Sequence, residues 1–182
     1  MPQQMQQSFK IYRMSLSWFD VGQCYEQFSL DAGFPVFFWQ LPGFDKWIYG
    51  FPAIDGPTGG LKVAATDDFS PISVDKVCRQ VSEEEVERAY RTYISPCLPA
   101  LGGPLRSSTC LITATPDSEF VIDYVPGSSR VLLVSACSGH GFKHSAAVGE
   151  CIGSLIKDGR SAIDISHFSL QRLFSEDRDP SA

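Results

Sequence analysis

The residues with the clearest chemical potential lie between a strand and a helix near the end of the chain. Residues 131–156 have the pattern of a strand, a loop with Gly139 and Gly141, and an amphipathic helix. Glycine lets a backbone approach a ligand closely, and the first N–H groups of a helix can bind an anion. His144 stands where the dinucleotide fingerprint GxGxxG has its third glycine. An anion-binding loop and a plain tight turn therefore both remain open.

Two lysines are candidate cations of a site. Lys62 lies in an apolar run, where strand alternation places it with Ala64 on the face opposite to Leu61 and Val63. That face could be simply solvated, or Lys62 could be a partly buried cation that lines a pocket and needs a compensating partner. Lys143, just after the two glycines, has the same two interpretations.

Other polar and aromatic residues carry weaker signals. Tyr49 lies between Trp47 and Phe51 on one face of a strand, a stripe that we interpret as core. His140 and His144 have no carboxylate or cysteine at metal-ligand spacing, so no metal is expected. The chain contains neither a Gly-x-Ser-x-Gly elbow nor a P-loop, which leaves hydrolase and NTPase functions without a motif.

The cysteines indicate the compartment. None of the six forms a CxxC pair, and the N-terminal residues show neither a basic nor an apolar segment of a secretory signal. We therefore expect reduced thiols in a cytoplasmic protein. The cysteines stand at positions 24, 78, 97, 110, 137 and 151.

The elements that must position these residues follow from periodicity. Turn residues at close spacing predict an antiparallel meander, and the apolar run 36–41 is expected to be a well-buried strand. Ser82 and Glu85 form the pattern of a capping box, and a second helix is expected to end before Gly159. Strands are expected at 9–19, 36–41, 47–51, 61–65, 110–115, 120–124 and 131–134.

Composition limits the class of protein. The chain has 182 residues, of which 43% are hydrophobic and 20% charged, enough for a real core in about one domain. No stretch has the length and apolarity of a membrane span, and a net charge of −6 without a basic run argues against nucleic acid as a partner.

Taken in order, the motifs resemble the C-terminal part of a known family. The runs 110–123, 138–143 and 148–150 are similar to those of monomeric sarcosine oxidase and N-methyltryptophan oxidase, which are FAD-dependent amine oxidases. The resemblance extends over residues 9–173. Further segments that fit are 34–35, 49–52, 60–62 and 164–172.

The resemblance implies how the cofactor would be held. Cys110 stands where the family attaches the flavin of FAD covalently through a cysteine sulfur. Gly139, His140, Gly141, Phe142 and Lys143 match the loop that wraps the flavin ring. The helix N-terminus behind this loop would stabilise negative charge on the flavin.

The resemblance also implies catalytic roles. Lys143 matches a lysine that holds the substrate carboxylate, Lys62 matches one that promotes reaction with oxygen, and Tyr49 matches a substrate-pocket tyrosine.

Three departures lie on the substrate side. Ile112 replaces a common tyrosine, Thr66 a common histidine and Phe38 a common methionine. The resemblance therefore implies a different or bulkier amine than sarcosine.

The implied fold is α+β: a largely antiparallel substrate-domain sheet with flanking helices, plus the last strand-loop-helix segment of an FAD-binding domain. The family's N-terminal Rossmann half has no counterpart here, so we expect a fragment. Residues 1–106 would form the substrate-domain meander and helix, 107–173 the flavin-binding segment, and 174–182 a disordered tail.

The implied reaction is oxidation of a secondary amine or N-methyl amino acid by oxygen to imine or aldehyde and hydrogen peroxide. The alternative is a non-catalytic subunit or interaction module that pairs with a separate FAD-binding chain. The expected partners are thus a small amine or amino acid, oxygen, and an FAD-binding half in another chain, with no nucleic acid and no membrane.

Overall fold

The structure, a computed structural model, describes residues 5, 7–43, 46–66 and 70–174. It divides into two compact units. The sheet unit comprises residues 13–111, and the hairpin unit comprises residues 1–12 and 112–182. Two long strands, β1 (Lys10–Phe19) and β6 (Pro104–Ala114), have residues in both.

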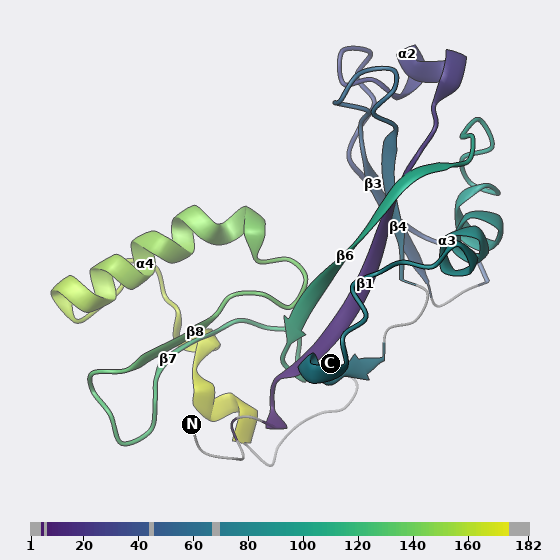
Figure 1. Cartoon of the computed structure of the whole chain (residues 1–182). Coiled ribbons are helices and arrows are strands. Elements are labelled where there is room, and N and C mark those ends of the chain that lie inside the picture. The colour runs from purple at the N-terminus through teal and green to yellow at the C-terminus, as the bar shows by residue number, and fades with distance from the viewer. Residues whose placement is uncertain (1–4, 6, 44–45, 67–69, 175–182) are drawn as a thin grey trace. The chain divides into compact units, whose positions relative to one another are not determined.

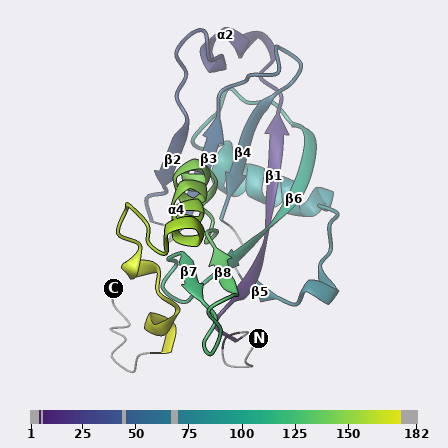
Figure 2. The ribbon, with the colours of Figure 1, turned by 90° about the vertical axis from the view of Figure 1, so that its left-hand side faces the viewer.

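The sheet is the antiparallel meander that the turn spacing predicts. The strand order is β2-β3-β4-β1-β5, with β6 also paired to β1, and Figure 2 shows β2, β3, β4, β1 and β6 side by side. The pairs β2·β3, β3·β4 and β4·β1 are antiparallel. The remaining strands of the sheet are β2 (Phe37–Gln40), β3 (Trp47–Phe51), β4 (Leu61–Ala65) and β5 (Pro71–Ile72).

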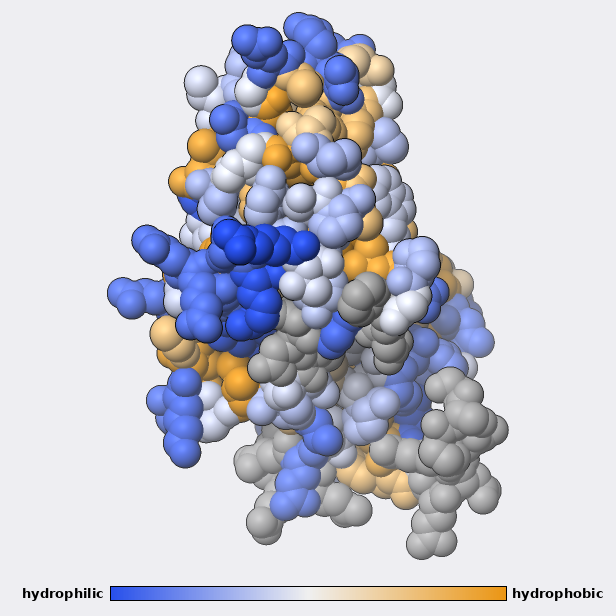
Figure 3. Space-filling view, turned by 90° about the vertical axis from the view of Figure 1, so that its right-hand side faces the viewer, coloured by the Kyte–Doolittle hydropathy of each residue, from blue (hydrophilic) through white to orange (hydrophobic). Residues whose placement is uncertain are grey.

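Alternation along the strands puts one face of the sheet into the core. Ile48, Leu61 and Val63 are almost completely buried. They pack in one cluster with Val86 and Ile94, which come from the helical segment that α3 (Glu83–Ala89) opens and a π-helical turn continues. Figure 1 shows α3 beside the sheet, and Figure 3 shows hydrophilic side chains gathered on the outer side of this helical segment.

The start of α3 confirms half of the capping-box prediction. The Ser82 hydroxyl accepts a hydrogen bond from the Glu85 N–H at 3.1 Å. The Glu85 carboxylate, however, accepts from the Arg13 guanidinium. The cap therefore holds the helix start, while the glutamate ties the helix to β1.

The prediction that residues 36–41 form a well-buried strand is wrong. The strand is β2, at the edge of the sheet, and only one of its faces packs on the core. Phe37 and Leu41 are buried, whereas Val36 and Phe38 are 63% and 62% exposed. A continuous apolar run cannot distinguish an edge strand from a central one.

The hairpin unit contains the other predicted elements. β7 (Val121–Tyr124) and β8 (Leu132–Ser135) pair antiparallel, and α4 (Ser145–Asp158) ends before Gly159 as predicted. Of the apolar stripe of α4 only Cys151 is buried. A small core joins Met5 and Val121 to Leu170 and Leu173.

Short helical elements complete the description. None of the six cysteines, all of which lie within the described residues, forms a disulfide bond. Among the described residues, no helix is both long and apolar enough to cross a membrane. The tail predicted to be disordered falls, beyond Phe174, outside the described residues. The short elements are α2 (Tyr25–Phe28) and 3-10 turns at Gly22–Cys24, Val74–Lys76, Phe142–His144, Ser166–Phe168 and Leu170–Phe174.

Candidate functional site

Lys62 lies on the face of the sheet that is opposite to the core. The strand register places it directly across from Phe51 on β3 and from Trp18 on β1. Its Nζ atom lies 5.1 Å from the centroid of the Phe51 ring and 5.5 Å from that of Trp18. The side chain is half-buried, so Lys62 is a cation held at an aromatic surface and not a residue of a simply solvated face.

A largely apolar cavity of about 410 Å³ adjoins the Lys62 ammonium. Trp18 and Phe51 line it together with exposed apolar residues such as Leu30 and Ile54. Among the described residues, Asp55 alone contributes a carboxylate to its lining. The cavity can therefore take a small apolar molecule beside a positive charge.

Tyr49 lies on the same face as Lys62, two residue pairs along the strands. It stands across from Ala64 on β4 and from Phe38 on β2, whose ring stacks on it at 5.9 Å between centroids. The expectation that its aromatic stripe belongs to the core is wrong, because Ile48 and Gly50 face the core instead. The register in which β3 pairs with its neighbours, and not the hydrophobicity of the stripe, therefore places Tyr49 on the face opposite to the core.

Burial raises the pKa of Tyr49 to about 12, and the charge of Cys110 adds to the shift. The Tyr49 hydroxyl is therefore neutral at physiological pH and can donate a hydrogen bond. Cys110 is half-buried on β6. The sheet unit thus contains three predicted site residues: Lys62, Tyr49 and Cys110.

The glycine loop lies in the hairpin unit, between β8 and α4. Gly139 has a φ of +80°, which favours glycine, and Ser138 before it has a φ of +45°. A Cβ atom on Gly141 would lie 1.7 Å from the Ala136 carbonyl oxygen, so only glycine fits there. The loop is therefore a built feature with a required backbone approach.

Side chains of the loop have distinct surroundings. His140 is held by Ser138, whose carbonyl oxygen lies 3.0 Å from its Nδ1 atom, and its ring stacks on Phe120 at 4.8 Å. Phe142 is 95% exposed, and Lys143 is exposed beside it. The loop leads through the 3-10 turn Phe142–His144 into α4, and the Ser145 N–H that opens α4 donates to the Phe142 carbonyl oxygen. An anionic or electron-rich ring edge fits such a loop.

Sequence reasoning missed two residues at the site. Arg106 stacks on the Trp18 ring with its Cζ atom 4.1 Å from the centroid. Its Nη2 atom also lies 3.0 Å from the Oδ2 atom of Asp55. Neither Arg106 nor Asp55 has a motif around it, and only the pairing of β6 with β1 brings Arg106 to Trp18.

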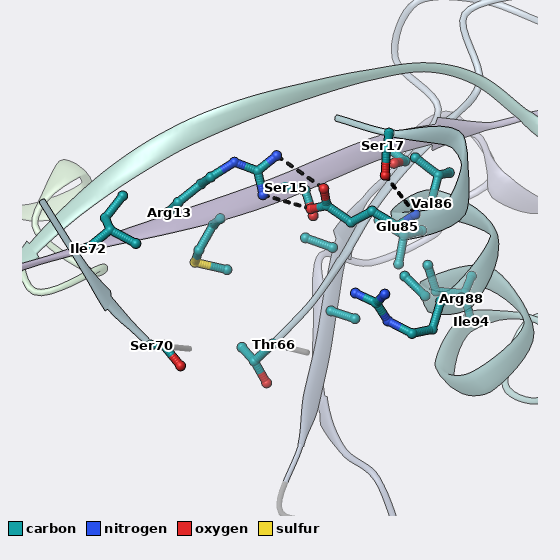
Figure 4. A pocket seen from close by; sticks show the side chains of 16 residues that line it. Arg13, Ser15, Ser17, Thr66, Ser70, Ile72, Glu85, Val86, Arg88 and Ile94 are labelled. Atoms are coloured by element: carbon teal, nitrogen blue, oxygen red, sulfur yellow. Dashed lines mark hydrogen bonds and ion pairs between the residues drawn. The ribbon is translucent and has the colours of Figure 1, made fainter. Parts of the chain in front are cut away.

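A second, more polar cavity of about 310 Å³ lies where α3 meets β1 and β4. Figure 4 shows Arg13 pointing its guanidinium at the Glu85 carboxylate, with N–O distances of 2.8 and 3.1 Å. Arg13 also donates to the carbonyl oxygens of Cys78 and Gln80. Arg13 and Glu85 therefore serve to hold α3 and the segment before it on the sheet.

The sequence matches the family described as FAD dependent oxidoreductase over residues 9–155, most of the chain. The chain belongs to this family. Among its curated relatives, monomeric sarcosine oxidase of Bacillus sp. (strain NS-129) is 34% identical over 163 residues, which are 88% of this chain and 41% of the relative. N-methyl-L-tryptophan oxidase of Shigella dysenteriae is 32% identical over 153 residues, 81% of this chain and 39% of the relative.

Solved structures share the fold of this chain over part of their own length. A mutant of Amadoriase I from Aspergillus fumigatus has a TM-score of 0.70 at 18% identity, covering 96% of this chain and 41% of that one. L-proline dehydrogenase from P. horikoshii has a TM-score of 0.68 at 20% identity, covering 91% and 40%. This chain spans about two fifths of the length of the curated relatives that it matches.

Proposed function

We propose that this FAD dependent oxidoreductase oxidises a secondary amine or N-methyl amino acid, with oxygen as the electron acceptor. The products would be an imine or aldehyde and hydrogen peroxide. The observation that carries the proposal is the half-buried Lys62 cation on the same sheet face as Tyr49. The names of the curated relatives, sarcosine and N-methyl-L-tryptophan oxidases, supply the substrate class.

The residues that would hold FAD are the thiol of Cys110 and the glycine loop. The half-buried Cys110 on β6 fits a covalent link through its sulfur, of which the thiolate is the reactive form. Gly139 and Gly141 allow the close backbone approach that a flat ring needs, and the start of α4 favours negative charge. When bound, the flavin accepts a hydride equivalent from the amine and passes electrons to oxygen.

The chain's own side chains would orient and polarise the reactants. Lys62 provides a fixed positive charge that stabilises reduced oxygen, and the adjoining apolar cavity admits the gas. Lys143 pairs with the carboxylate of the substrate. Tyr49, neutral at working pH, donates a hydrogen bond in the substrate pocket.

The substrate we propose is bulkier than sarcosine. The Thr66 hydroxyl is engaged with the backbone of Trp47, whose N–H donates to it at 2.9 Å. Thr66 therefore satisfies backbone groups at the start of β3, and its side chain is not titratable. Phe38 adds an exposed ring stacked on Tyr49 and on Trp47. Together the two departures remove a titratable group and add aromatic surface.

Residues beyond the matched region would complete the flavin site, because the relatives are more than twice as long as the part they share with this chain. They could belong to the same polypeptide or to a separate FAD-binding chain, with which this chain would act as a subunit. Six cysteines without a disulfide favour a reducing compartment, and we place the protein in the cytoplasm.

The test is amine-dependent peroxide release. The chain would be supplied with FAD alone and with FAD plus the FAD-binding half of a related sarcosine oxidase, then given sarcosine, N-methyl-tryptophan or a matched primary amine. Peroxide that depends on an N-methyl amine and falls in Lys62→Met supports the proposal. Absence of retained flavin and of peroxide in both preparations would contradict it.

A further inference from the structure

We propose that Trp18 and Phe51 are positioning residues that hold the Lys62 ammonium between two aromatic rings, and that Arg106 with Asp55 holds Trp18 in turn. The placement stands on the geometry alone. Only the use of the Lys62 charge toward oxygen rests on the proposed function.

The register of three adjacent strands places two aromatic residues beside Lys62. Trp18 on β1 and Phe51 on β3 stand directly across from Lys62 on β4, one on each side. Residues directly across antiparallel strands share a face of the sheet and lie close enough for side chains to touch. Both rings approach the Nζ atom to within 5.5 Å of their centroids, inside the range of a cation–π contact.

The charge of Lys62 faces aromatic rings. Within the part of the chain that the structure describes, no carboxylate forms an ion pair with Lys62. The carboxylate in the adjoining cavity, Asp55, pairs with Arg106 instead. The rings therefore hold the ammonium without neutralising it. A cation that is fixed in place but not paired keeps its field for a negative charge that develops nearby.

The Trp18 ring is in turn supported by a residue of β6. Arg106 on β6 stacks on the Trp18 ring at 4.1 Å, and its other contact is the ion pair with Asp55 at 3.0 Å. Lys62 and Arg106 thus reach the indole from two of the strands that pair with β1, namely β4 and β6. A planar guanidinium packs well against an aromatic face, so the pair restricts the ring that in turn restricts the lysine.

The experiment observes Lys62 directly and needs no flavin. Reductive dimethylation with carbon-13 formaldehyde labels lysine amines and keeps their charge. Methyl groups held over aromatic rings resonate upfield because of ring currents. The Lys62 signal would be assigned by its loss in Lys62→Arg, and Lys157, exposed near the end of α4, gives the reference position.

The expected result is a Lys62 methyl signal upfield of Lys157. The shift should be partly lost in Trp18→Leu and in Phe51→Leu, and largely kept in Trp18→Phe, which retains a ring. Arg106→Gln should broaden the signal or move it toward the reference while the protein stays folded by circular dichroism. Phe51→Leu and Arg106→Gln keep the test decisive if Trp18→Leu does not fold.

A Lys62 signal at the Lys157 position in the unaltered protein would overturn the inference. So would an upfield signal that neither Trp18→Leu nor Phe51→Leu moves. Because the measurement is made without FAD, its failure is distinct from failure of the proposed function, which flavin retention and peroxide release report separately.

Discussion

At the scale of single residues, the hydroxyl of Tyr49 is the group whose chemistry the fold alters most clearly. Burial and the charge of Cys110 both disfavour its ionised form. Tyr49 therefore stays a hydrogen-bond donor over the whole physiological range, as the proposed substrate pocket requires. The half-buried Lys62 complements it by keeping its positive charge on the same face.

The titration of Tyr49 gives the first prediction. With its pKa raised from 10.0 to about 12, the stabilising contribution of Tyr49 is complete below pH 10. It is lost as the pH rises from 10 to 12, because the unfolded chain ionises first. Between those limits, the free energy of unfolding should fall more steeply in the unaltered protein than in Tyr49→Phe.

Denaturant unfolding at pH 8 and pH 11 measures this difference. Carbon-13 labelling of tyrosine rings follows the same group directly, since one signal should be missing from Tyr49→Phe. Equal pH dependence of the two proteins would show that Tyr49 is not shifted.

At the scale of elements, the Arg13–Glu85 contact fastens α3 to the sheet. Burial alone raises the pKa of the Glu85 carboxyl, but the hydrogen bonds from Arg13 and Ser15 and the charges of Arg13 and Arg88 outweigh it. The net pKa of Glu85 is lowered below 4.5. Glu85 therefore stabilises the fold above pH 4.5, and that contribution is lost as the pH falls through its folded pKa.

A double-mutant cycle tests this contact. Arg13→Met or Glu85→Gln should lower the free energy of unfolding by about 1.5–3 kcal/mol, as for other hydrogen bonds to charged groups. Their effects should be less than additive in the double variant, because either change removes the same contact.

The exposed pair Glu87–Arg91 on the same helical segment is the matched control. Both of its side chains are largely exposed, so its coupling should be only about 0.3–0.5 kcal/mol. A coupling between Arg13 and Glu85 no larger than this would mean that the buried contact does not hold α3.

The sequence could predict which face of its strand Lys62 occupies, but not which side chains surround it. Alternation in the run around Lys62 correctly separated it from Leu61 and Val63, because both of those are buried on the core face. The rings that contact Lys62 depend on pairing between strands far apart in the sequence, which periodicity does not encode. The exposure of Phe38 likewise follows from the edge position of β2.

For the glycine loop, likewise, the sequence could predict its place in the chain but not its contacts. Its place between a strand and a helix was predictable, because both neighbours have clear periodicity. The need for glycine at position 141 was not, since it comes from the approach of the Ala136 carbonyl oxygen. Cys110 as a site residue came from the family resemblance, and its half-buried place on β6 came from the fold.

At the scale of the whole molecule, apolar surface around the Lys62 cavity predicts association. Leu30, Val36 and Ile54 are each more than 60% exposed and line this one cavity. Exposed apolar patches of this kind mark interaction surfaces. We therefore expect the isolated chain to bind a hydrophobic dye and to self-associate as its concentration rises.

Light scattering and dye fluorescence check this prediction, with Leu30→Gln/Ile54→Gln as the variant. Both side chains are exposed, so the double change should reduce dye binding without lowering stability. A monodisperse monomer that binds no dye would show that this apolar surface does not mediate association.

The central claim, that this chain carries the flavin anchor of an amine oxidase, is tested most directly by peptide mass after incubation with FAD. Trypsin should release residues 107–130, which contain Cys110 alone, and residues 131–143, which contain Cys137 alone. The incubation is done with and without the FAD-binding half of a related sarcosine oxidase. We predict the mass of a flavin on peptide 107–130, none on peptide 131–143, and its loss in Cys110→Ser. Peptide 107–130 without flavin in both incubations, or flavin on another cysteine, would contradict the account.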